Sequence, residues 1–305
     1  MERFELNILG CGSALPTTRH FPSSQVVNLR DKLYMIDCGE GAQIQFRNLG
    51  LNFNRLNHIF LSHLHGDHCF GLPGLLSTLN LLGKTGELVI HGQPDVEKVF
   101  RPILNYFCTD MSYSIKFNTF SPFKNELVFE DRTLKVYSIP LKHRVPTCGY
   151  LFEELPKQPH IIREMIDFYQ IPVKQLNAIK NGEDFITPEG EIIPYTRLTR
   201  QAESPKKYAY CSDTAYSEKI IPIIEGIDLL YHEATFCEKD LPRAKETAHS
   251  SAKQAALIAQ KAGVKKLMIG HFSARYPHTD ILLQEACAIF PATVLAKELL
   301  TYSIS

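Results

Sequence analysis

The most restrictive feature of this sequence is a cluster of four potential metal ligands within six residues, His63-Leu64-His65-Gly66-Asp67-His68. The cluster directly follows a short apolar run at 58–61, which predicts a buried strand. His63 and His65 are two residues apart, so both side chains face the same side of an extended backbone. Imidazole nitrogens and carboxylate oxygens bind Zn²⁺ and similar ions. The cluster therefore predicts a site for one or two metal ions; the plainer alternative is a histidine-rich surface turn.

Short apolar runs and helical patterns alternate along the rest of the chain, which predicts an α/β fold. The expected strands begin at Leu6 and cover 25–28, 33–36, 58–61, 88–91, 134–139, 208–211, 229–231 and 267–269. The expected helices cover 42–49, 72–82, 250–262 and 281–289. Gly263 is placed to end the helix at 250–262.

Three further candidate ligands follow three of these strands. His143 follows the strand at 134–139, Asp213 follows the strand at 208–211, and His271 follows the strand at 267–269. In open α/β sheets, ligands bind beyond the carboxyl ends of the strands. We therefore expect these side chains to meet the histidine cluster at one rim.

The composition of the chain excludes several classes of protein. The chain has 305 residues, of which 44% are hydrophobic, with Lys+Arg and Asp+Glu balanced at 33 each. This excludes a fibrous or disordered protein and a globally basic nucleic-acid binder, but it allows a local basic patch. No apolar run approaches the ~18 residues of a membrane span, and the start lacks the pattern of a signal peptide. The eight cysteines are scattered without a C-x-x-C pair, so we expect free thiols, a cytoplasmic location and no membrane association.

These motifs together resemble the metallo-β-lactamase superfamily and, more closely, the ribonuclease Z family of tRNA 3′-processing endonucleases. The resemblance covers almost the whole chain. It rests on Leu9-Gly10-Cys11-Gly12-Ser13 with Pro16-Thr17 and Arg19, Asp37-Cys38-Gly39-Glu40-Gly41, 62–68 with 70–74, His143 with Gly149-Tyr150, Ser212-Asp213-Thr214, His232-Glu233-Ala234-Thr235, His249-Ser250-Ser251-Ala252, and Gly270-His271-Phe272-Ser273-Ala274-Arg275-Tyr276.

The resemblance implies a four-layer αββα sandwich formed by a single domain, 1–305, with two Zn²⁺ per subunit. One zinc would be held by His63, His65 and His143, the second by Asp67, His68 and His271, with Asp213 bridging the two. It implies removal of the 3′ trailer from precursor tRNA by attack of a metal-bound hydroxide, which leaves a 3′-hydroxyl on the tRNA and a 5′-phosphate on the trailer. Asp67 would accept the proton of the water, or would serve as a ligand only.

Several other residues become candidates through the same resemblance. His249 would donate a proton or contact phosphate, and Glu233 would orient it; a satisfied, non-functional histidine is the alternative. Asp37 would steady a ligating histidine or serve as an ordinary turn residue. Arg275 and Tyr276 would contact RNA phosphate or pack at the rim.

The stretch 153–207 is polar and interrupted by six prolines, with eight basic and nine acidic residues. Helical patterns are expected at 161–169 and 173–181. The resemblance implies a protruding, tRNA-binding arm here, in a homodimer in which one arm presents tRNA to the partner's active site. Phosphate contacts are expected from Arg197, Arg200, Lys206 and Lys207; a solvated loop is the alternative.

Two other functions compete with a tRNA-processing endonuclease. One is a different hydrolase of the superfamily, such as a phosphodiesterase, an arylsulfatase or a lactonase. The other is a non-catalytic RNA-binding protein on the same fold. The complete ligand set argues against the second.

Overall fold

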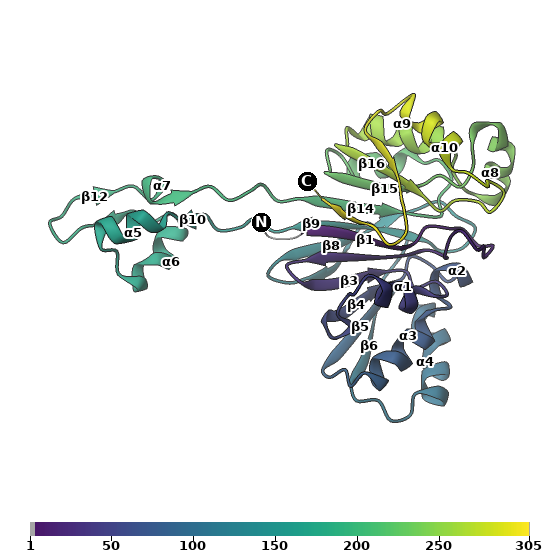
Figure 1. Cartoon of the computed structure of the whole chain (residues 1–305), viewed down its shortest axis with the longest axis horizontal. Helices are drawn as coiled ribbons and strands as arrows, with labels where there is room; N and C mark the ends of the chain where they lie inside the picture. The colour runs from purple at the N-terminus through teal and green to yellow at the C-terminus, as the bar shows by residue number, and fades with distance from the viewer. Residues whose placement is uncertain (1–3, 305) are drawn as a thin grey trace. The chain divides into compact units, whose positions relative to one another are not determined.

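The computed structural model describes residues 4–304, which divide into two units, 4–153 with 206–304 and 154–205. The first unit contains two seven-stranded sheets (Figure 1). Their strand orders are β18-β1-β2-β3-β4-β5-β6 and β17-β16-β15-β14-β9-β8-β7. In the first sheet β3 to β6 run parallel, and in the second sheet β14 to β17 run parallel.

The strands of the first sheet are β1 (Phe4–Gly10), β2 (Ser24–Leu29), β3 (Lys32–Ile36), β4 (Leu56–Phe60), β5 (Glu87–Gly92), β6 (Ser114–Thr119) and β18 (Thr301–Ser303). The strands of the second sheet are β7 (Leu127–Glu130), β8 (Leu134–Pro140), β9 (Cys148–Glu154), β14 (Lys207–Cys211), β15 (Leu229–Glu233), β16 (Lys266–Gly270) and β17 (Thr293–Leu295). The α-helices of this unit are α1 (Ala42–Asn48), α2 (Gly66–Cys69), α3 (Leu72–Leu81), α4 (Asp95–Phe107), α8 (Leu241–Thr247), α9 (Ala252–Ala262) and α10 (Asp280–Cys287), with short 3₁₀ helices at Phe53–Arg55, Glu218–Ile223 and Glu238–Asp240.

The first sheet lies between two hydrophobic cores, and its side chains alternate between them. Along β3 and β4, Tyr34, Ile36 and Phe60 belong to the core shared with the second sheet, whereas Met35 and Ile59 belong to the core under α1, α3 and α4. Successive strand residues point to opposite faces, so each strand here is buried on both sides. Helices α9 and α10 cover the second sheet (Figure 1). The result is the four-layer αββα sandwich.

The second unit, 154–205, is described by itself. It contains β10 (His160–Ile161), α5 (Arg163–Tyr169), a 3₁₀ turn (Val173–Gln175), α6 (Leu176–Lys180), β11 (Phe185–Ile186), β12 (Ile192–Ile193), α7 (Tyr195–Leu198) and β13 (Thr199–Arg200). It has a small hydrophobic core of its own, formed by Ile171, Ile179, Phe185, Ile193 and Leu198. The two helical patterns expected here are confirmed.

The strands and helices expected elsewhere from the sequence are also present, but α2, α4, α8, β6, β7, β9, β17 and β18 were not predicted. Helix α4 carries Pro102 in its interior, a residue that normally argues against a helix. Strand β6 is only partly buried, so its apolar pattern is weak. No helix in residues 4–304 combines the length and apolarity needed to cross a bilayer.

The loops after β3 and α2 approach each other closely at Gly71. Gly71 N–H donates to the Cys38 carbonyl at 2.9 Å, and a Cβ at Gly71 would lie 2.1 Å from the Gly39 carbonyl oxygen. A side chain here would force the two loops apart.

We expect Gly71→Ala to lower the free energy of unfolding by about 1–3 kcal/mol, because the backbone contact leaves no room for a methyl group. Gly74→Ala, inside α3, is the matched control. A Cβ at Gly74 would meet only the flexible end of the Gln43 side chain, at 3.1 Å. Urea denaturation monitored by circular dichroism compares the two. Equal stability of both variants would contradict this account.

Candidate metal centre

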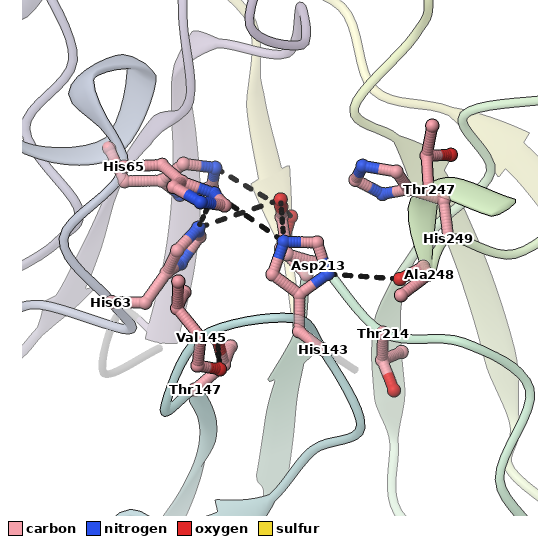
Figure 2. Close-up of polar contacts among 12 residues, drawn as sticks. His63, His65, His143, Val145, Thr147, Asp213, Thr214, Thr247, Ala248 and His249 are labelled. Carbon is pink, nitrogen blue, oxygen red and sulfur yellow. Dashed lines mark hydrogen bonds and ion pairs between the residues drawn. The ribbon is translucent and has the colours of Figure 1, made fainter.

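Loops at the carboxyl ends of strands from both sheets carry the candidate ligands to one place. His63 follows β4, His143 follows β8, Asp213 follows β14, and His271 directly follows β16. His65 precedes the short helix α2, which carries the remaining two, Asp67 and His68. Figure 2 shows His63, His65, His143 and Asp213 pointing toward one another.

The first group consists of three imidazoles and one carboxylate. His65 Nδ1 lies 3.0 Å from His63 Nε2 and 3.4 Å from His143 Nε2. Asp213 Oδ2 lies 3.6 Å from the Nε2 atoms of His63 and His143. These four atoms are close enough to serve as ligands of a single ion.

The second group consists of Asp67, His68 and His271. Asp67 Oδ2 lies 3.3 Å from His68 Nε2 and 3.4 Å from His271 Nε2. The other oxygen of Asp213, Oδ1, lies 3.1 Å from His68 Nε2 and 3.0 Å from His271 Nε2. Asp213 therefore presents one carboxylate oxygen to each group.

Four of the five imidazoles have their outer ring nitrogen held by a hydrogen bond. His143 Nδ1 donates to the Ala248 carbonyl at 3.0 Å, as Figure 2 shows, and His271 Nδ1 donates to Thr235 Oγ1 at 2.9 Å. An N–H on the outer nitrogen of a neutral ring leaves a lone pair on the inner nitrogen. Asp67 Oδ2 is buried without a hydrogen-bond partner among the described residues. Lone pairs and a carboxylate oxygen that face one another fit a bound cation.

Asp37 organises the histidine cluster from behind. Its buried carboxylate accepts hydrogen bonds from Ser62 N at 2.7 Å, Ser62 Oγ at 2.9 Å, His68 Nδ1 at 2.7 Å and Tyr210 Oη at 2.7 Å. Ser62 Oγ in turn accepts from His63 Nδ1 at 3.0 Å. One carboxylate thus orients a ligand of each group.

Glu233, at the end of β15, orients two other histidines. Its buried carboxylate accepts from His249 Nδ1 at 2.8 Å and from Thr235 Oγ1 at 2.5 Å. Thr235 Oγ1 is the acceptor of His271 Nδ1. Glu233 therefore orients His249 directly and His271 through Thr235.

The electrostatics of the centre favour bound positive charge. Burial and the neighbouring His68 hold the pKa of His63 well below its usual range, which keeps that ring neutral. Burial alone would raise the pKa of Asp213, but His271 and His68 outweigh it and keep this carboxyl ionised. His68 is the exception among the rings: burial lowers its pKa, yet Asp213, Asp67 and Asp37 outweigh burial and raise it. Without a cation, that imidazole carries the positive charge that the carboxylates attract.

His249 lies beside this centre with its side chain 12% exposed. Burial lowers the pKa of His249, but the Glu233 carboxylate outweighs burial and raises the pKa to about 9. The imidazole is therefore protonated at neutral pH, and Nε2 remains as a proton donor. His232, in contrast, is fully buried, and its Nδ1 donates to the Glu233 carbonyl at 2.7 Å, which is a structural role.

Three residues of the centre have a left-handed backbone, with φ of 56° at Asp37, 59° at Asp213 and 60° at His271. This conformation is uncommon for residues other than glycine. Each of the three lies one or two residues beyond the end of a strand, where the left-handed conformation turns the chain sharply. Such strain persists only where surrounding contacts hold it, and it concentrates at functional sites.

The centre opens into a cavity of about 990 Å³ lined by His65, Asp67, Asp213, His249 and His271. Exposed basic residues lie at its wall, namely Arg144, Arg243 and Arg275. Arg275 pairs with Asp240 at 3.3 Å and lies over the Phe236 ring. Tyr276 is buried, and its hydroxyl donates to Asp240. These contacts fit packing at the rim, the second of the two roles expected for Tyr276.

The four basic residues expected to meet phosphate belong to different units. Arg197 and Arg200 lie exposed in the second unit, where Arg197 is positioned over the Tyr169 ring. Lys206 and Lys207 belong to the first unit. There Lys207 pairs with Glu153 at 2.6 Å and Lys206 pairs with Asp228 at 3.9 Å. Of the four residues expected in the arm, Lys206 and Lys207 thus lie just outside the unit 154–205.

Several residues that contact or line the centre had no role assigned from the sequence. Ser62, Thr235 and the Ala248 carbonyl orient the ligands, and Arg144 and Arg243 line the cavity. Ser62 and Arg144 adjoin predicted ligands, and that position was the only signal for them. The Ala248 contact involves a backbone atom and leaves no sequence signal.

Comparison with known proteins gives two kinds of match. A family model described as anti-Pycsar protein Apyc1 matches residues 4–143, less than half of the chain. Ribonuclease Z of Parabacteroides distasonis is 64% identical over 304 residues, and ribonuclease Z of Bacteroides fragilis is 60% identical over 304 residues; in both cases the match covers 100% of each chain.

Solved structures show the same fold at low identity. The human short-form tRNase Z superposes with a TM-score of 0.71 at 23% identity, covering 99% of each chain. The metallo-β-lactamase fold protein YhfI from Bacillus subtilis superposes with a TM-score of 0.69 at 19% identity, also covering 99% of each chain. The chain thus has the metallo-β-lactamase fold and, on its identity to full-length relatives, belongs to the ribonuclease Z family.

Proposed function

We propose that this chain is an endoribonuclease that removes the 3′ trailer from precursor tRNA. The full-length relatives at 55–64% identity are named ribonuclease Z. The observation that carries the proposal is the convergence of seven histidine and aspartate side chains, split by Asp213 into two groups. A non-catalytic RNA-binding protein would have no need for such an arrangement.

Two divalent cations held there, which we propose to be zinc, would supply a water of lowered pKa and positive charge for the phosphodiester. His63, His65 and His143 would hold the first ion, Asp67, His68 and His271 the second, and Asp213 both. The outer hydrogen bonds that orient the inner nitrogens of His63, His68, His143 and His271 support this assignment. Borderline ions such as zinc suit this set of nitrogen and oxygen donors.

Asp67 is the base that we propose for the attacking water. His68 lowers the pKa of Asp67 against the effect of burial, so the carboxylate is ionised. Oδ2 has no hydrogen-bond partner among the described residues. A role as ligand only is the alternative; a carboxylate that binds a metal through one oxygen can keep the other free for the water.

His249 is the acid that we propose for the leaving group. A proton on Nε2 would pass to the 3′ oxygen that leaves with the tRNA, giving a 3′-hydroxyl there and a 5′-phosphate on the trailer. Glu233 holds the ring and stabilises its protonated form. Arg275, Arg144 and Arg243 at the cavity wall are placed to meet phosphates next to the scissile bond.

The second unit is the part that we propose binds the tRNA body, as an inserted arm of the single domain. It folds around its own core and supplies none of the candidate ligands. Its six basic and eight acidic residues make it slightly acidic, so binding would rely on shape and on a few exposed arginines such as Arg197 and Arg200 more than on bulk charge.

We also propose a homodimer. Helices α3 and α4 pack against each other and expose several large apolar side chains, which supports this proposal. These side chains are Leu81, Val99, Tyr106 and Phe107. The cytoplasmic location stays a prediction; the unpaired state of all eight cysteines fits a reducing compartment.

We expect Asp67→Ala to reduce cleavage of precursor tRNA by at least about 100-fold, because it removes the proton acceptor and a ligand. Binding of the precursor should remain, because we propose that the second unit makes the main contacts with the tRNA body. A gel cleavage assay and filter binding measure the two. Asp110→Ala, at an exposed site, is the control. Retained turnover in Asp67→Ala would contradict both proposed roles.

We expect His249→Ala to reduce turnover of precursor tRNA by ~10²–10⁴-fold, the usual contribution of a general acid. The loss on bis(4-nitrophenyl) phosphate should be much smaller, because nitrophenolate leaves without a proton. His278→Ala removes an exposed histidine and is the control. Equal losses on both substrates would show that His249 does not act as the acid.

The arm can be removed at a point that the sheet register defines, because Glu153 pairs with Lys207 across antiparallel β9 and β14. We expect replacement of 154–205 by a short Gly-Ser turn to preserve hydrolysis of bis(4-nitrophenyl) phosphate. The KM for precursor tRNA should rise at least about tenfold, a loss of ~1.4 kcal/mol of binding. An unchanged KM for the tRNA would mean that the arm does not bind it.

A further inference from the structure

A second group of potential metal ligands lies outside the centre described above. Cys11 follows β1, His20 lies in the loop before β2, and Glu298 lies between β17 and β18. Cys11 is buried, while the side chains of His20 and Glu298 are 27% and 13% exposed. One potential ligand atom of each side chain lies within 4.8 Å of the other two.

The separations of these atoms fit three ligands of one tetrahedral ion. Cys11 Sγ lies 3.5 Å from His20 Nδ1 and 3.6 Å from Glu298 Oε1, and His20 Nδ1 lies 3.4 Å from Glu298 Oε1. Zinc bonds of ~2.3 Å to sulfur and ~2.0–2.2 Å to nitrogen and oxygen place tetrahedral ligands roughly 3.3–3.6 Å apart. The nitrogen–oxygen separation exceeds that of a usual N–H···O hydrogen bond, about 2.7–3.2 Å.

We propose that Cys11, His20 and Glu298 form a third metal site, for a borderline divalent cation such as Zn²⁺. Thiolate, imidazole and carboxylate together suit that class of ion. The exposed side of His20 leaves a fourth position to water. Binding forms a metal–sulfur bond in place of the S–H bond of Cys11, and the displaced proton passes to solvent.

The site would act on the wall of the catalytic cavity. Cys11 and His20 delimit a loop whose residues Ser13, Ala14, Leu15 and Pro16 line the cavity. The Cys11 carbonyl accepts from Phe272 N at 2.9 Å, and Ser13 N donates to the Phe272 carbonyl at 3.1 Å. Phe272 directly follows the candidate ligand His271. A cation bound by Cys11, His20 and Glu298 would link the loop 11–20 to the C-terminal segment. It would thereby fix the part of the cavity wall that lies beside His271.

The competing reading is a hydrogen-bonded cluster without metal. Glu298 Oε1 also accepts from Phe21 N at 2.8 Å, and the Cys11 thiol lies 3.6 Å from the Ala296 carbonyl. The two readings differ in whether the sulfur binds a cation. That difference can be measured independently of the catalytic centre, because none of the seven catalytic ligands is a cysteine.

The experiment is reconstitution of the full chain with Co²⁺, with near-ultraviolet absorption and total metal content as readouts. We expect a cobalt–thiolate charge-transfer band in the wild type. Cys11→Ser should abolish that band and remove one ion per chain, while the ions of the catalytic centre remain. Cys287→Ser, which removes a half-buried thiol far along the chain, should leave both the band and the metal content unchanged.

Glu298→Gln keeps the proposal testable if Cys11→Ser does not fold. Gln retains an acceptor for Phe21 N but loses the charge, so metal at this site should bind more weakly and the band should titrate at higher Co²⁺. The proposal is overturned if the wild type shows no thiolate band, or if the band and metal content survive in Cys11→Ser. Catalytic activity enters neither readout, so failure here is distinguishable from failure of the proposed nuclease function.

Discussion

The buried carboxylate of Asp37 is the interaction on which the rest of the centre depends. It accepts hydrogen bonds from the loop after β4, from α2 and from Tyr210 on β14, so it joins both sheets at the rim. A carboxylate buried without partners would cost several kcal/mol, and four donors satisfy it fully. Because those donors include His68 and, through Ser62, His63, the same contacts that stabilise the interface between the sheets also orient the ligands.

Glu233 repeats this arrangement for the second sheet. Its two oxygens hold His249 and Thr235, and Thr235 holds His271. Loops are mobile on their own, and ligand positions must be held within about 0.5 Å to be useful. Two buried carboxylates supply that precision at the rim, where Asp37, Asp213 and His271 have a left-handed backbone.

Much of the fold was predictable because the strands of both sheets are short, apolar and separated by turn residues. The helix at α9 was predictable from its alanine spacing and from Gly263, which ends it with φ of 60°. Helix α4 was not, because Pro102 argues locally against a helix that is stabilised by packing of Val96, Phe100 and Leu104. The buried state of Tyr276 was equally hidden, since its partner Asp240 has no fixed spacing from it.

The sequence alone determined which chemical groups are present and that they lie at the ends of strands: His63 to His68 after β4, then His143, Asp213 and His271. Only the tertiary structure decided that His68 and His271, 203 residues apart, lie within 3.4 Å, and that Asp213 presents one oxygen to each group. It also brought Cys11 within reach of Glu298, 287 residues away. The physical reason is that periodicity reports how each segment is buried, whereas the distance between two loops depends on how whole sheets pack.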